Sequence, residues 1–474
     1  MNGIHDGGAP SLPKSASLSI DFIIVGGGIA GLACAVALRR VGHRVLVLER
    51  EESFDSAHKS PGGTRMPPNM TKIFYHWGMG DEVKRIAAVS ERVFLHRFDS
   101  GNMLGAHRWD KEMLNEAGGE FMFLHHGSLH RMLYETALEL GARIRTRAEV
   151  VSVDVEGRSV TLTTGEVIQG DVIVGADGAK GLCRETVVGP NDPSKPTGLM
   201  MFNAVIPGQK MHSVPELATI LRQDLVTQFV WFGDHHCALC FRIGHDDDCA
   251  FYFYAPDDGS SSSDVWDDIV PPEVLLQHVR GAEPRLQKLA SLASSSRMQV
   301  TERTDLDDWV HDDGPLLLVG EAAHPFPPGA IQAGGMSVED ASVLAKLFSH
   351  LRSHDQIESF LYAFQDLRQA RCSKNRVQDM ANIYFMTLPE GEQTELRDAT
   401  MREKHDRGLN VLDTDEDDGN SAQWDEIREI FGYDAEDEAD NWWVQWGLLR
   451  ERAKAANSGV EFAMDIQIHQ CDGN

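Results

Sequence analysis

Three glycines at fixed spacing follow a short apolar run near the start of the chain. Gly26, Gly28 and Gly31 complete a G-x-G-x-x-G pattern between the β-branched run 22–25 and an apolar segment of helical length. In a strand–turn–helix unit, the first glycine permits a tight turn and the second lets the backbone approach a pyrophosphate. The third allows close packing of helix and strand. The helix N-terminus also offers free N–H groups to phosphates, so this pattern predicts a dinucleotide site.

An acid occupies the matching position after the second strand of the unit. Residues 30–41 predict a helix and 44–48 predict a second buried strand, which ends at Glu49. A carboxylate at this point can accept hydrogen bonds from a ribose diol. A glycine-rich turn in an ordinary α/β protein is the alternative interpretation, but the position of the acid favours a dinucleotide.

A second stretch also places an acid at the end of a buried strand. Residues 172–178 read VIVGADG, so Asp177 follows the strand directly. Its carboxylate could hold a sugar-like hydroxyl or a nicotinamide cofactor, and the glycines permit a close backbone approach. Taken alone, a plain strand-to-helix turn explains this stretch equally well.

The third stretch lies far along the chain, at 316–341. A strand ends at Gly320, Glu321 follows, and a proline-rich loop leads to Gly334 and Gly335, where a helix begins. The free N–H groups of that helix could stabilise negative charge on a ring system. A rigid loop before a capped helix is the alternative, but three separated elements suited to one dinucleotide disfavour it.

Two kinds of strand pattern divide the chain. Buried runs at 22–25, 44–48, 171–175 and 316–320 are typical of a parallel sheet. Between 199 and 254, four longer runs separated by turns predict an antiparallel sheet instead. We therefore expect an α/β fold: a Rossmann-like domain with an inserted, mostly antiparallel sheet and C-terminal helices.

Composition excludes several classes of partner. The 474 residues carry a net charge of −29, which argues against binding to nucleic acid or to an anionic membrane surface. No run approaches the ~20 apolar residues that cross a bilayer. The seven cysteines are sparse and odd in number, so we expect no disulfide framework and a reducing, cytoplasmic location.

A cluster of histidines and cysteines at 235–245 resembles a metal site at first sight. In a strand, however, Cys237 and Cys240 would point to opposite faces. We therefore interpret these residues as sheet packing rather than zinc ligands and predict no metal site.

In this order, the three motifs resemble the FAD-dependent aromatic-ring monooxygenases, the class of salicylate and hydroxybenzoate hydroxylases, especially its fungal members. The resemblance spans roughly 21–380. It implies FAD as the cofactor, with NADH or NADPH binding transiently to reduce it. It also implies that one atom of O2 is delivered to an electron-rich ring or alkene, which means hydroxylation or epoxidation of a small molecule, in secondary metabolism.

The resemblance assigns roles by position. The residues that would hold the ADP part of FAD are Gly26, Gly28, Gly31 and Glu49. Asp177 would belong to a motif shared by FAD and NAD(P)H, and Glu321 would hold the ribityl or pyrophosphate region. Gly63, Arg65 and His126 would also lie next to the cofactor. The residues expected to position the isoalloxazine are Pro328, Gly334 and Gly335.

Several positions depart from the family pattern. Glu321 stands where the family has Asp. His126 replaces the Arg that precedes the helix at 128–140, which removes a permanent cation. Gly181 replaces a Ser of the second motif. On the inserted sheet, Asn203 and either Cys240 or Phe241 occupy the places of an Arg and a Tyr that act on phenolic substrates in fungal relatives, which weakens the case for a phenolate substrate.

Composition and strand patterns, together with the resemblance, predict a division into domains. The expected parts are a disordered lead-in at 1–18, an FAD-binding domain from 19–195 and 296–380, a substrate-binding domain at 196–295, and an acidic helical extension at 381–474. In the extension, we expect mobile acidic stretches at 413–420 and 434–440 and a docking helix at 442–455. Apolar sheet residues are expected either to line the substrate pocket or to pack in the core: Phe202, Trp231, Phe241 and Phe253.

Other readings of the same fold remain open. A flavin halogenase or a dehydrogenase is one, although the Trp-x-Trp-x-Ile-Pro motif of halogenases is absent. A non-catalytic member that binds a protein is another. The intact Gly28, Glu49 and Asp177 argue against it, whereas His126 and Glu321 leave it open. The sequence does not indicate which substrate is used, whether NADH or NADPH is preferred, or whether the chain forms a homodimer.

Overall fold

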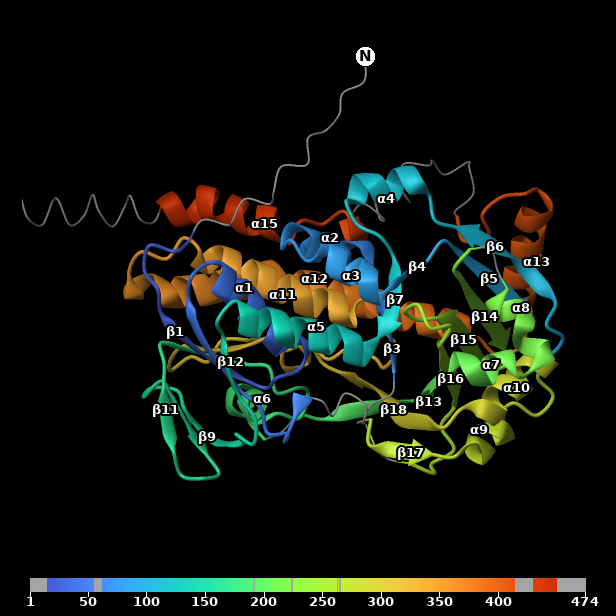
Figure 1. The fold of residues 1–474 in the computed structure, drawn as a ribbon, viewed down its shortest axis with the longest axis horizontal. Helices are drawn as coiled ribbons and strands as arrows, with labels where there is room; N and C mark the ends of the chain where they lie inside the picture. Colours follow the sequence, from blue (N-terminus) through green and yellow to red (C-terminus); the bar gives the residue numbers. More distant parts are fainter. Residues whose placement is uncertain are drawn as a thin grey trace, which may run out of the picture.

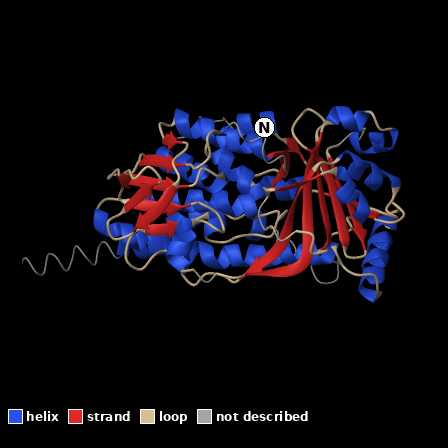
Figure 2. Ribbon diagram, turned by 90° about the horizontal axis from the view of Figure 1, so that it is seen from below, coloured by secondary structure: helices blue, strands red, loops and turns tan. Residues whose placement is uncertain are grey.

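The computed structural model describes residues 15–54, 62–190, 192–222, 225–261, 263, 266–413 and 429–449. Two lobes lie side by side: one combines helices with small sheets, and the other contains one large twisted sheet (Figure 1; Figure 2). Most of the expected lead-in at 1–18, the acidic stretch at 414–420 and the tail from 450 lie outside the described residues.

The first lobe is built on a five-stranded parallel sheet. In spatial order its strands are β19 (Leu316–Leu318), β12 (Val172–Gly175), β1 (Asp21–Val25), β2 (Arg44–Leu48) and β8 (Arg143–Arg145). β12 and β19 are buried along their whole length, as strands covered on both faces must be. The sheet therefore joins two separated segments of the chain and confirms the predicted α/β class.

One helix forms the centre of this lobe. α11 (Ala333–Phe348) is buried at nearly every position from Gly335 onward, which is typical of a helix packed on all sides. The helices that pack against it are α1 (Ile29–Arg40), α2 (Pro68–His76), α12 (Ile357–Met386) and α15 (Ala435–Trp442). α1 also packs against α5 (His126–Glu139).

The second lobe is an eight-stranded sheet that is antiparallel except where β14 pairs with β5. Its strands, in spatial order, are β17 (Asp268–Val270), β18 (Ser295–Arg303), β13 (Ser194–Ile206), β16 (Cys249–Pro256), β15 (His236–Arg242), β14 (Thr227–Gly233), β5 (Arg92–Arg97) and β6 (Met103–Arg108). The helices of this lobe are α7 (Gly208–His212), α8 (Ala218–Leu221), α9 (Pro272–His278), α10 (Pro284–Leu292) and α13 (Glu392–Asp406).

Side chains alternate between the two faces of the large sheet, as the period of a strand requires. Phe202 belongs to the apolar cluster formed with α9 and α10, whereas its neighbour Met201 belongs to the cluster on the opposite face. Cys240 and Cys237 are divided between the same two clusters. The predicted separation of these two cysteines is therefore confirmed.

A small antiparallel sheet joins the lobes. It consists of β3 (Gly63–Met66), β7 (Met122–His125) and β4 (Ala88–Val89). β3 contacts β13 and β16 on one side and α11 on the other. The remaining elements are α3 (Gly80–Ile86), α4 (Lys111–Ala117), α6 (Leu182–Val188), β9 (Val150–Asp154), β10 (Ser159–Leu162) and β11 (Val167–Gln169).

Two expectations change with the structure. The acidic stretch 434–440 is not a loose tail, because it forms α15, which Asp434 caps and which packs on α11. The large sheet also takes β5, β6 and nearly all of β18 from outside 196–295, so the proposed domain boundaries remain a prediction. Among the described helices, none has the length and apolar character needed to cross a bilayer.

Candidate active site

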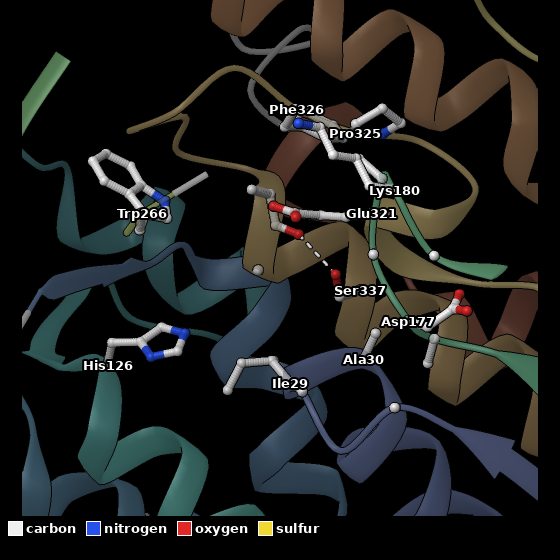
Figure 3. A pocket seen from close by; sticks show the side chains of 18 of the residues that line it. Ile29, Ala30, His126, Asp177, Lys180, Trp266, Glu321, Pro325, Phe326 and Ser337 are labelled. Atoms are coloured by element: carbon white, nitrogen blue, oxygen red, sulfur yellow. Dashed lines mark hydrogen bonds between the residues drawn. The ribbon is translucent and has the colours of Figure 1, made fainter. Parts of the chain in front are cut away.

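One cavity of about 820 Å³ is lined by both lobes. The turn after β1, the segment after β12 and the loop before α11 supply its walls in the first lobe. β3 and the large sheet supply the opposite wall. Figure 3 shows that side chains from these separate elements point into the same space.

The glycine turn after β1 has the geometry that a pyrophosphate requires. Gly26 has a φ of +106°, and a Cβ there would collide with the backbone of Ala176. A Cβ on Gly31 would collide with the Gly26 carbonyl, so this glycine permits close packing of α1 on β1. No atom lies within 4 Å of a Cβ built on Gly28. The N-terminus of α1 therefore opens onto free space in which a phosphate fits.

Glu49 follows β2 and lines the same end of the cavity. Its carboxylate accepts the N–H of Gly27 at 2.7 Å and the N–H of Glu51 at 2.8 Å. These two bonds fix the side chain beside the glycine turn. Because a carboxylate can accept about four hydrogen bonds, acceptor positions remain for a ribose hydroxyl.

Asp177 lies after β12, directly beside the first glycine turn, and lines the same cavity. One carboxylate oxygen accepts the N–H of Cys183 at 2.8 Å, while the other is buried without a partner. Burial raises the pKa of Asp177. A Cβ on Gly181 would collide with this carboxylate, which explains why glycine replaces the expected serine. The unpartnered oxygen fits a hydroxyl donor from a ligand.

His126 and Glu321 face the middle of the cavity from opposite walls (Figure 3). Both side chains are open to the cavity, but the surrounding protein shields them from bulk water. This desolvation lowers the pKa of His126 to about 4, with nearby His130 acting in the same direction. Desolvation raises the pKa of Glu321, against the opposing effect of His324. His126 is therefore a neutral donor or acceptor at pH 7 rather than a cation.

Buried charges fix the loop that precedes α11. Asp340 accepts the N–H of Gly320 at 2.9 Å, and its other oxygen lies 2.9 Å from Nε of Arg368. His324 Nε2 lies 2.6 Å from the same carboxylate. His324, Asp340 and Cys372 are close enough to share a metal ion. Arg368 already brings a positive charge to Asp340 and Cys372, so these residues form an ion-pair network.

The sheet wall differs from the predicted lining. The residues of the large sheet and its adjoining loop that line the cavity are Met201, Asn203, Tyr252, Trp266, Met298, Thr301 and Arg303. Phe202, Trp231 and Phe253 pack in the cluster on the far face. Phe241 lies on the near side but contacts Phe123 in the core. Of the two alternatives for these four aromatic residues, core packing therefore holds and pocket lining does not.

Comparisons with known proteins agree with this geometry. A family model described as "FAD binding domain" matches residues 19–376. The chain belongs to this family. FAD-dependent monooxygenase OpS4 of Beauveria bassiana (strain ARSEF 2860) is 27% identical over 81% of this chain and 89% of its own. The 6-hydroxynicotinate 3-monooxygenase of Bordetella bronchiseptica (strain ATCC BAA-588 / NCTC 13252 / RB50) is 25% identical over 77% of this chain and 91% of its own.

A solved structure gives the same result for the fold. The crystal structure of CtdE in complex with FAD and a substrate superposes with a TM-score of 0.75 at 17% identity, covering 91% of this chain and 100% of that one. The chain is accordingly a flavoprotein of the FAD-dependent monooxygenase class, with FAD as its cofactor.

For this FAD-binding chain, most of the predicted site residues meet at the cavity. Those that line it are Gly26, Gly28, Glu49, Gly63, Arg65, His126, Asp177, Glu321, Pro328 and Gly334. Gly31 lies behind the turn, and Gly335 faces Gln332 and Asn69 instead. Sequence reasoning missed Lys180, although it belongs to the second motif. It also missed Tyr252, which lies opposite Asn203 on the neighbouring strand, a pairing that one sequence does not reveal.

Proposed function

We propose that the residues lining the cavity hold FAD and that the chain hydroxylates or epoxidises an aromatic or polycyclic small molecule. NADH or NADPH supplies two electrons and O2 supplies the oxygen, so that one oxygen atom enters the substrate and the other leaves as water. The observation that carries the proposal is the continuity of the cavity. It runs from a phosphate-type glycine turn to a sheet wall with Met201, Tyr252 and Met298, which offers apolar contacts to a second, flat ligand.

The residues present fit FAD at each part of the cavity. Gly28 and the N-terminus of α1 would hold the pyrophosphate, and Glu49 would hold the adenosine ribose. Asp177, His126 and Glu321 offer hydrogen-bonding groups along the ribityl region, and the unpartnered Asp177 oxygen supports this fit. When bound, FAD supplies the redox chemistry and the activation of oxygen.

The protein itself would position the flavin ring and exclude water from the cavity. Pro328 and Gly334 would bracket the isoalloxazine, and the first N–H groups of α11 would face the negative charge that the reduced ring carries. Met201, Met298 and Phe326 line the adjoining space, which excludes water from the reaction. Hydroxylation is supported by the names of relatives such as 6-hydroxynicotinate 3-monooxygenase. The cytoplasmic location remains a prediction from the sequence, and the oligomeric state stays open.

The proposal is tested first by the visible spectrum of the purified, desalted chain. We expect a flavin spectrum that is bleached by NADH or NADPH and returns in air. A colourless chain that does not take up added FAD would contradict the proposal and favour the non-catalytic alternative.

Gly28→Ala provides a matched variant for this test. The space around a Cβ at Gly28 is free of protein atoms and φ is −73°, so the variant should fold with an unchanged melting temperature in the absence of FAD. The added methyl group would occupy the approach to the pyrophosphate. We expect FAD affinity to fall at least tenfold in fluorescence titration. Full flavin content in the variant would show that the pyrophosphate lies elsewhere.

A further inference from the structure

One buried cation in the cavity forms no direct ion pair with any residue that the structure describes. Arg65 lies on β3, is 7% exposed and lines the cavity. Its guanidinium donates to the Gly329 carbonyl, and its Nε is buried without a hydrogen-bond partner. Within the part of the chain that the structure describes, Arg65 forms no ion pair within 4 Å. A buried charge without a partner is strongly disfavoured, so this site favours an incoming anion.

The Arg65 charge already acts on the groups around it. The guanidinium lies 5.6 Å from the centre of the Tyr252 ring. Burial raises the pKa of Tyr252, and the Arg65 charge lowers it in part. Burial likewise raises the pKa of Asp379, to about 6, while the N–H of Gln332 and the Arg65 charge oppose this rise. Arg65 therefore stabilises negative charge at this end of the cavity.

A second unpartnered group lies on the same wall. Asn203, on β13, is 9% exposed and lines the cavity, and its Oδ1 is buried without a partner. Asn203 pairs with Tyr252 across β13 and β16, so the amide and the guanidinium flank the same aromatic ring. Around them the wall is apolar, with Met201 and Met298. The wall thus combines one cation, one acceptor and a flat apolar surface.

We propose that Arg65 determines substrate specificity by pairing with an anionic oxygen on the substrate ring, and that Asn203 Oδ1 accepts a hydrogen bond from a second substituent. This inference rests on the proposed function. The substrate class is an aromatic or enolic compound with one ionised oxygen, either a carboxylate or a phenolate, and one hydroxyl or N–H donor. Arg65 on β3 thereby supplies the cation that β13 lacks at Asn203.

The test uses the FAD-loaded enzyme and two pairs of probes. The carboxylate arm compares 3-hydroxybenzoate with the nearly isosteric, neutral 3-hydroxybenzamide by perturbation of the flavin spectrum. The phenolate arm compares ionised with protonated 4-nitrophenol, whose absorbance reports its ionisation. We expect the anion of at least one pair to bind at least tenfold more tightly than its neutral partner, and the arm that responds identifies the anion.

Variants of Arg65 assign this preference. Arg65→Met keeps an unbranched stem but removes the charged guanidinium, and it should reduce the preference for the anion below threefold. Arg65→Lys keeps the charge and should retain part of the preference. FAD affinity is measured for both variants as well, because the family resemblance places Arg65 next to the cofactor, and the loss of preference should exceed any loss of FAD affinity. As a control, Arg303→Gln removes a guanidinium of the same cavity that Asp192 already pairs at 2.8 Å, and it should leave the preference within threefold.

Three results would overturn the inference. The first is that neither probe pair shows a preference for the anion. The second is that this preference survives in Arg65→Met. The third is that Arg65→Met weakens FAD binding tenfold or more while the preference for the anion is unchanged. The last result would assign Arg65 to the flavin. If the wild-type chain itself binds no FAD, the proposed function fails first and the inference falls with it.

Discussion

At the scale of single residues, His324 shows how a buried charge depends on its partners. The ring is buried, and its Nε2 lies 2.6 Å from Asp340. Burial opposes the charge, but Cys372 and Asp340 raise the pKa of His324 to about 10. Because the folded pKa exceeds the ordinary value of 6.5, folding favours the protonated ring. This contribution to the free energy of unfolding is complete below pH 6.5 and is lost as the pH rises through about 10.

The pH dependence of stability tests this ion pair. We expect the free energy of unfolding to fall by up to about 1.4 kcal/mol per pH unit between pH 6.5 and 10, and His324→Gln should flatten this slope. Urea denaturation at pH 7, 8 and 9 measures it. His43→Gln is the control, because burial lowers the pKa of His43 to about 4 and the ring is neutral throughout. Equal slopes in wild type and His324→Gln would exclude a charged His324.

At the scale of elements, the C-terminal segment holds α11 from outside. Trp443, directly after α15, is 6% exposed and stacks on His350 of the segment after α11, with ring centres 4.8 Å apart. Asp440 of α15 pairs with Lys346 at 2.8 Å and with His350 at 2.9 Å. The acidic composition of α15 therefore serves specific pairing with α11, the helix whose N-terminus faces the cavity.

Substituting two nearby tryptophans, one buried and one exposed, tests whether packing of this segment stabilises the protein. Trp443→Ala should lower the free energy of unfolding by about 3–5 kcal/mol, because it removes a large buried side chain. Trp446 is 63% exposed, so Trp446→Ala should change the free energy of unfolding by less than about 0.5 kcal/mol. Urea denaturation with and without FAD measures both. Similar effects of the two substitutions would contradict the docking of this segment.

The same scale shows what the sequence could predict. Strong apolar runs were predicted well: that of β2 has the bounds expected from the sequence, and that of β12 begins one residue later than expected. The glycines and prolines around β3 favour a loop from sequence alone, yet tertiary pairing with β7 makes this segment a strand. The sequence shows that side chains alternate between the two faces of β13. It does not show which face meets the cavity, because that depends on where β3 packs against the sheet. Local patterns therefore predicted the FAD end of the site better than the substrate end.

At the scale of the whole molecule, the charge of −29 opposes the approach of an anionic co-substrate. NADPH carries phosphate groups, and NADH carries fewer because it lacks the 2′-phosphate. Long-range repulsion extends about 30 Å at 0.01 M ionic strength but only about 8 Å at 0.15 M. Salt should therefore speed the encounter of either nucleotide with the enzyme.

Stopped-flow reduction of the flavin at low nucleotide concentration tests this expectation. We expect the second-order rate constant for NADPH to rise several-fold between 0.01 and 0.15 M salt, and the constant for NADH to rise less. The comparison of the two nucleotides is the internal control, because salt effects on the flavin itself are common to both. A rate that falls with salt would mean that cations near the entrance, such as Lys180 at the cavity wall, outweigh the net charge in guiding the nucleotide.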